Sequence, residues 1–299
     1  MKIINLIDLQ LKIIKSWEQF PSKEQFLKDF FSLGHAYFVG PLGDLEKNYE
    51  LFQSNASDWQ EYREQVLKLK SCEEEAKIKI NIDKVEHFFN IKLVGEVVLF
   101  VMFSYIDGYA RFHEGTHRVF IGLTFPPPHP DYYDVLETHE LTHVARESRP
   151  ENWLSWGLQP NQKNEEFIQK QPALEHLFGE GFSCAVSELL NPGINIWEYV
   201  YQSKDGYELI LKNADEVNRV IHEAIIQEEK TPGSFHYFKF YSEDTYNPPL
   251  PLFTQYVWAY AWVKELLKKN TPQNLLTVCS KDLRSYALDF FFNPSKTAS

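Results

Sequence analysis

The sequence predicts an α+β protein, in which a small lobe of antiparallel strands is followed by a larger and mainly helical C-terminal lobe. Residues 96–105 and 118–125 are rich in β-branched and aromatic side chains, which is typical of strands. From residue 131 onward, helix-type spacing and clear stop signals dominate the chain. These observations favour a sheet at residues 94–125 and a helical lobe at residues 131–299.

The length of the chain allows one large domain or two lobes. We expect a helical N-terminal region over residues 1–93, with one compact two-lobed unit after it over residues 94–299. The first fifteen residues form an apolar pattern interrupted by Asp8 and Lys12, which predicts an amphipathic helix rather than a secretion signal. Residues 77–83 alternate between apolar and polar side chains, and we interpret them as a short strand.

Composition and charge narrow the class of protein. Hydrophobic residues make up 43% of the chain and aromatic residues 15%, which is enough for a large core. The net charge of −12 argues against nucleic acid or an anionic membrane as a partner, because binding to either requires basic patches. No apolar run approaches the ~20 residues of a membrane span. The widely spaced Cys72, Cys184 and Cys279 imply no disulfide framework, and we expect a cytoplasmic protein.

The pattern H-E-x-x-H occurs twice. The first copy runs from His113 to His117 between two strand-like segments, with Gly115 at its centre. This arrangement predicts a β-hairpin turn, where two histidines have no fixed one-turn spacing. We therefore interpret the first copy as a loop sequence rather than a metal site.

The second copy, His139 to His143, has helix signals on both sides. A proline-rich stretch breaks the preceding strand, and Asp131 or Asp134 can cap a helix that runs from Val135 to Arg146. On a helix, His139 and His143 lie one turn apart on one face and can offer two imidazole nitrogens to one metal ion. Glu140 can take a proton from a metal-activated water, which indicates a zinc-dependent peptidase. The alternative is a core helix with two satisfied histidines.

Zinc in hydrolases usually takes three protein ligands. No glycine and histidine follow His143 at the spacing of H-E-x-x-H-x-x-G-x-x-H, so that subclass is excluded. A second helix is predicted over Ala173–Leu190, where Pro172 suits the first turn and Asn191-Pro-Gly suits the end. Glu180 in this helix is our candidate for the third ligand.

Glu180 is flanked by Gly179 and Gly181, each of which weakens a helix by about 1 kcal/mol relative to alanine. We expect that another helix approaches closely here, namely the one that carries the two histidines. A carboxylate buried at such a contact needs a charge partner, which a metal provides; the alternative is an ordinary solvated glutamate. Glu175 and Glu188 compete for the same role. His176, one turn before Glu180, is either a group near the metal or an ordinary core or surface histidine.

The segments His139-Glu-Leu-Thr-His-Val-Ala-Arg146 and Gly179-Glu-Gly-Phe-Ser183 together resemble a bacterial family of predicted zinc-dependent proteases. That family is classed as a domain of unknown function and includes YjaZ-like proteins. The resemblance covers residues 96–190, and it implies a gluzincin-like fold with His139, His143 and Glu180 as zinc ligands and Glu140 as base. Residues 255–263 are similar to the family's Gly-Tyr-x-x-Gly-Tyr-x-x-Val pattern, with Gln255 and Ala259 in place of the glycines.

The oxyanion formed during peptide hydrolysis needs a hydrogen-bond donor besides the metal. Tyr256 and Tyr260 lie one turn apart on one face of a helix predicted over residues 253–269, and Tyr256 matches the first tyrosine of the family pattern. His236 and Tyr237 are rival candidates. In a chain so rich in aromatic residues, a core role is the alternative for each of them.

Three further predictions complete the interpretation. Residues 119–125 form either an exposed strand edge that can pair with an extended peptide or a central strand with no free edge. Helices are expected at residues 207–229 and 281–290, with loops at residues 160–171 and 232–251. The expected function is hydrolysis of peptides or proteins with one Zn²⁺ per chain. The alternatives are a catalytically silent metal-binding regulatory protein, which an intact Glu140 disfavours, and a helical binding protein with no metal.

Overall fold

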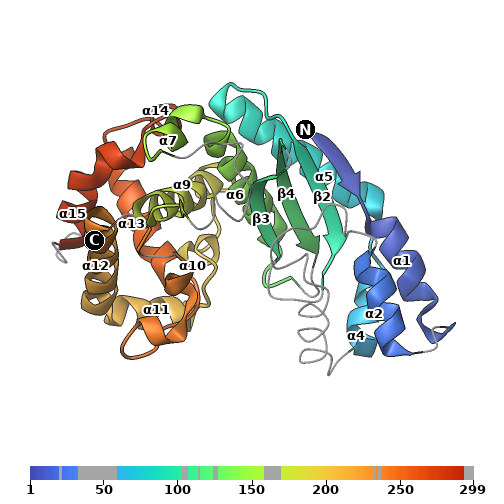
Figure 1. Ribbon diagram of the computed structural model, residues 1–299. Coiled ribbons are helices and arrows are strands. Elements are labelled where there is room, and N and C mark those ends of the chain that lie inside the picture. Colours follow the sequence, from blue (N-terminus) through green and yellow to red (C-terminus); the bar gives the residue numbers. More distant parts are fainter. Residues whose placement is uncertain are drawn as a thin grey trace. The chain divides into compact units, whose positions relative to one another are not determined.

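The computed structural model describes residues 1–19, 22–32, 59–102, 107–113, 115–123, 127–157, 170–231, 233–234 and 237–292 (Figure 1). These residues form helices and one four-stranded sheet, which confirms the α+β class. The chain divides into two compact units, Met1–Val144 and Ala145–Ser299. The division falls inside helix α6, so the last turn of that helix belongs to the second unit.

The sheet contains β1 (Lys2–Asn5), β2 (Glu96–Val101), β3 (Gly108–His113) and β4 (Thr116–Leu123), in the order β1-β2-β4-β3 (Figure 1). The prediction of an antiparallel sheet is wrong, because β2 pairs parallel with both β1 and β4 and only β3 and β4 are antiparallel. The two inner strands are apolar and buried over Val97–Val101 of β2 and Val119–Leu123 of β4. That pattern is typical of strands covered on both faces, as parallel strands usually are.

The N-terminal region differs from the prediction at two places. The expected helix over the first fifteen residues begins only at Ile7, as α1 (Ile7–Lys15), because the preceding residues form β1. The expected strand at residues 77–83 is wrong, because it lies inside α5 (Ser71–Phe89). Ile78, Ile82 and Val85 of α5 are buried at helical spacing, and this longer period decides the conformation over the local alternation. The other helical elements before β2 are η1 (Trp17–Gln19), α2 (Lys23–Ser32) and α4 (Trp59–Val66).

The first H-E-x-x-H copy lies in a hairpin, as predicted. Strand β3 ends at His113, and β4 begins at Thr116. Gly115 between them has φ of 78°, a left-handed conformation that favours glycine.

The first unit holds α6 (Tyr132–Glu147) against the sheet and against α5. The hydroxyl of Tyr132 donates to Asp107, just before β3, at 2.7 Å. The side-chain amide of Asn81 in α5 donates to Asp134 at 2.9 Å and to Glu137 at 2.6 Å. Helix α6 begins at Tyr132, three residues before the predicted start. Asp134 consequently lies inside the first turn and not at the cap.

The second unit is helical. Helix α9 (Ala173–Leu190) has the predicted bounds, whereas the helix expected at residues 207–229 is broken at Asn213. The loop expected at 160–171 lies almost entirely outside the described residues, and the loop expected at 232–251 contains two short 3₁₀ helices in its described part. The remaining elements are α7 (Pro150–Leu154), α10 (Ile196–Tyr199), α11 (Lys204–Lys212), α12 (Ala214–Lys230), η4 (Tyr237–Tyr241), η5 (Glu243–Thr245), α13 (Thr254–Leu267), α14 (Pro272–Leu276), η6 (Ser280–Leu283) and α15 (Arg284–Phe292).

Helices α9 and α13 pack closely at Gly181. A Cβ atom at this position would lie 2.2 Å from the carbonyl oxygen of Ala259 in α13, so only glycine fits. The glycine therefore serves the contact with α13, and our expectation that it admits the histidine-bearing helix is wrong.

Among the described helices, none is both long and apolar enough to cross a membrane.

Candidate metal centre

The two histidines of the second H-E-x-x-H copy lie on consecutive turns of α6, as their spacing predicts. The Nε2 atoms of His139 and His143 are 3.1 Å apart. Two nitrogens that each lie 2.0–2.1 Å from a tetrahedral zinc ion would be roughly 3.3 Å apart. The pair therefore has the spacing of two ligands to one ion.

Glu180 of α9 supplies the third group. One ligand atom from each of His139, His143 and Glu180 lies within 4.8 Å of the others, and the described residues contain no other group of this kind. His139 is buried, and the other two side chains are partly exposed. Two imidazole nitrogens and one carboxylate oxygen are a donor set that zinc hydrolases use. These residues could hold a metal ion.

A buried ion pair joins the last turn of α6 to the first turns of α9. The Arg146 side chain donates to both carboxylate oxygens of Glu175, at 3.0 Å from Nε and 2.9 Å from Nη2. Arg146 also donates to the carbonyl oxygens of Leu275, Leu276 and Val278, and its guanidinium lies 4.4 Å from the centre of the Phe178 ring. This pair was not predicted from the sequence, because α6 contains many polar residues and no local pattern links Arg146 to Glu175.

Glu140 lies next to His139 and is buried. Its side chain is covered by the start of β3, because a Cβ atom on Gly108 would lie 3.2 Å from Glu140 Cγ and 2.9 Å from Leu136 Cδ1. Glycine at this position therefore lets the strand backbone approach the side of α6 that carries Glu140.

The two candidate tyrosines of α13 have different surroundings. The hydroxyl groups of Tyr256 and Tyr241 lie 3.0 Å apart. Burial and the nearby carboxylate of Glu180 raise the pKa of Tyr256 well above its usual value. Tyr260 instead donates to Glu188 at 2.8 Å, and Lys264 binds the same carboxylate. Of the two, Tyr256 is therefore the one that the structure brings towards a candidate ligand.

The rival candidates are also placed. Glu175 pairs with Arg146, and Glu188 pairs with Tyr260, so neither joins the metal-binding group. His236 lies outside the described residues, and Tyr237 belongs to η4. His176 lies beside Glu180 on α9.

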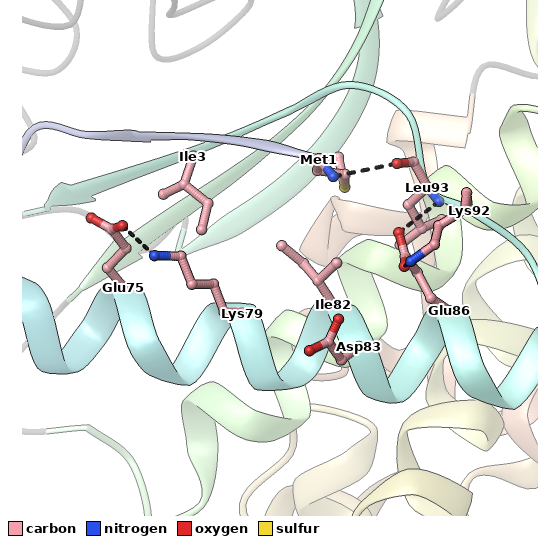
Figure 2. A pocket seen from close by; sticks show the side chains of 9 residues that line it. All are labelled: Met1, Ile3, Glu75, Lys79, Ile82, Asp83, Glu86, Lys92 and Leu93. Carbon is pink, nitrogen blue, oxygen red and sulfur yellow. Dashed lines mark hydrogen bonds and ion pairs between the residues drawn. The ribbon is translucent and has the colours of Figure 1, made fainter.

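A separate pocket of about 500 Å³ lies in the first unit, lined by residues of β1, α5 and the segment just before β2 (Figure 2). Four of the charged side chains on its wall form two ion pairs. Lys79 donates to Glu75 at 2.6 Å, and Glu86 accepts hydrogen bonds from Lys92 and from the backbone of Leu93. No predicted site residue lines this pocket.

No protein-family model matches this chain, and no curated protein or solved structure matches it.

Proposed function

We propose that this protein is a zinc-dependent peptidase with His139, His143 and Glu180 as metal ligands and Glu140 as general base. The observation that carries the proposal is the convergence of two imidazoles and a carboxylate from two helices. Metal binding alone does not need Glu140, whereas hydrolysis needs a base at that place. The resemblance of the two sequence segments to a family of predicted gluzincin-type proteases supports the same function.

Each side chain of the site has a distinct task in this mechanism. His139, His143 and Glu180 would hold a zinc ion, which would supply Lewis-acid polarisation of the peptide carbonyl and would lower the pKa of the attacking water. Glu140 accepts a proton from that water and passes it to the leaving amine. Tyr256 donates its phenolic hydrogen to the developing oxyanion. A phenol carries this hydrogen at neutral pH, because the ordinary pKa of tyrosine is about 10.

The outer edge of β3 is suited to hold an extended peptide near Glu140. Strand β4 is central, whereas β3 is the terminal strand of the sheet among the described residues. A terminal strand presents backbone N–H and C=O groups that another chain can pair with. Gly108, the first residue of β3, lies against Glu140. A peptide added to this edge would be oriented by backbone hydrogen bonds, with little reading of its side chains.

The substitution Glu140→Gln tests the proposal. Metal analysis should find one zinc per chain in the wild type and in Glu140→Gln, and no zinc in His139→Ala. Digestion of a peptide library, followed by mass spectrometry, should show cleavage by the wild type. The loss of the base should reduce this cleavage by about 10²–10⁴-fold in Glu140→Gln.

Glu208→Gln is the matched control, because Glu208 is an exposed carboxylate on α11 outside the metal-binding group. It should retain both zinc and cleavage. A zinc-loaded wild type that cuts no peptide would favour the regulatory alternative. Cleavage by Glu140→Gln at the wild-type rate would exclude Glu140 as the base.

A further inference from the structure

A buried imidazole lies beside the candidate carboxylate ligand. His176 precedes Glu180 by one turn of α9, and its Nδ1 atom is 3.6 Å from Glu180 Oε1. Only 2% of the His176 side chain is exposed. Helical side chains point back towards the N-terminus of their helix, so the Glu180 carboxylate lies over the turn that carries His176.

The ring of His176 is fixed by aromatic residues of η4. It lies nearly parallel to the Phe240 ring, with centres 6.1 Å apart and planes at 16°. The Tyr241 ring approaches it at 61°, with centres 5.9 Å apart. These contacts restrict rotation of the imidazole and keep Nδ1 directed at Glu180.

The same η4 segment also reaches Tyr256. The Tyr241 hydroxyl lies 3.0 Å from the Tyr256 hydroxyl. The nearby Glu180 carboxylate contributes to the raised pKa of Tyr256. His176 and Tyr256 therefore both lie near Glu180, and Tyr241 contacts each of them. All four residues belong to the second unit and come from α9, η4 and α13.

We propose that His176 is a positioning residue, which holds the carboxylate of Glu180 in the orientation that metal binding requires. In the tautomer that carries hydrogen on Nδ1, the ring presents an N–H group to Oε1 at 3.6 Å, a contact that a small shift on metal binding would close to a hydrogen bond, while the other oxygen is left for the metal. Partners of this kind orient metal ligands, and their loss typically weakens metal binding by about 10–100-fold. The inference rests on the metal site of the proposed function, but it does not require that the site cleaves peptides.

Two substitutions at His176 separate positioning from other roles. The amide nitrogen of asparagine can take the place of Nδ1, whereas the amide of glutamine extends to the place of Nε2. Zinc affinity, measured by competition with a chromophoric chelator, should fall by about 10–100-fold in His176→Gln. His176→Asn should bind zinc nearly as well as the wild type. The visible absorption of the Co²⁺-substituted protein, which reports ligand geometry, should change in His176→Gln and be restored in His176→Asn.

His222→Gln is the matched control, because it makes the same exchange on α12, where His222 lies against Phe292 and outside the metal-binding group. It should bind zinc like the wild type. Wild-type affinity in His176→Gln would overturn the positioning role. Equal losses of zinc affinity in His176→Gln and His176→Asn would also overturn it. Such a result would mean that the whole imidazole is needed, either as a metal ligand or for packing. A wild type that binds zinc but cuts no peptide would contradict the peptidase alone, and one that binds no zinc would overturn both proposals.

Discussion

Single side chains decide what chemistry this protein can perform, and each depends on its local surroundings. Three histidines illustrate the range. His139 and His143 face each other across 3.1 Å, whereas His117 lies in β4 with no hydrogen bond to its Nδ1 atom within the described residues. The same residue type can therefore serve as a metal ligand in one place and act as an apolar ring in another.

His117 should make the folded protein sensitive to acid. Burial lowers the pKa of His117 from 6.5 to about 4. Between these pH values the unfolded chain binds a proton that the folded chain does not, so this contribution to stability is lost as the pH falls. The free energy of unfolding of the wild type should decrease by about 2 kcal/mol between pH 7.5 and pH 5 from this group alone.

The measurement is urea unfolding at both pH values, in the presence of EDTA, for the wild type and for His117→Phe. The phenylalanine variant removes the titrating group but keeps a ring beside Phe112, which contacts His117 edge-on at 4.9 Å. The wild type should lose about 2 kcal/mol more than the variant on acidification. Equal losses would show that His117 does not carry the effect.

At the level of secondary structure, the candidate site depends on how α6 and α9 are fixed to each other. The pair formed by Arg146 and Glu175 is buried at both ends, with each side chain only 2% exposed. Arg146 lies one turn after His143 on α6, and Glu175 lies about one turn before Glu180 on α9. This pair therefore ties together the two helices that carry the ligands.

Arg146→Met should destabilise the protein by about 3–5 kcal/mol, because it leaves the Glu175 carboxylate buried without its charge partner. Arg219→Ala is the control, since Arg219 forms ion pairs with Glu216 and Glu223 on the exposed side of α12, and pairs of that kind contribute at most about 1 kcal/mol. Chemical denaturation measures both effects.

The double variant Arg146→Met with Glu175→Met should be much less destabilised than the sum of its two single variants. If the destabilisation of the double variant equals the sum of the two single variants, Arg146 and Glu175 are not energetically coupled.

The sequence predicted individual elements better than their pairing. The bounds of α9 follow from Pro172 and from the Asn191-Pro-Gly stop, which are local signals. The hairpin around Gly115 is equally local. The parallel pairing of β2 with β1 and β4 joins residues far apart in sequence, and no local pattern specifies it. The break at Asn213 was missed because helical periodicity continues on both sides of it.

The same distinction applies to the site. His139 and His143 could be predicted because a helix converts their spacing into proximity, and Glu180 because of its unusual glycine neighbours. The structure brings these three together, but the glycine at position 181 serves the contact with α13. Tyr241 was not predicted, because one tyrosine in an aromatic-rich loop carries no spacing signal. Its partnership with Tyr256 depends on tertiary packing.

In the whole molecule, the three candidate ligands come together only when the chain is folded, so zinc should stabilise the native state. Free zinc at 100 times its dissociation constant adds about 2.7 kcal/mol to the free energy of unfolding. Thermal unfolding should therefore shift upward by several degrees with zinc and return with EDTA. His139→Ala should show no such shift. A shift of the same size in that variant would place the bound zinc elsewhere.

The pairing of β1 with β2 has a practical consequence for handling the protein. Val97 to Val101 of β2 are all buried, and β1 covers the open side of that strand. Removal of the first five residues would expose unpaired backbone N–H and C=O groups along β2, which is a strongly apolar strand. Such an edge can pair with the same edge of another molecule. Shortened versions that begin at Leu6 should therefore precipitate even though every candidate ligand is intact.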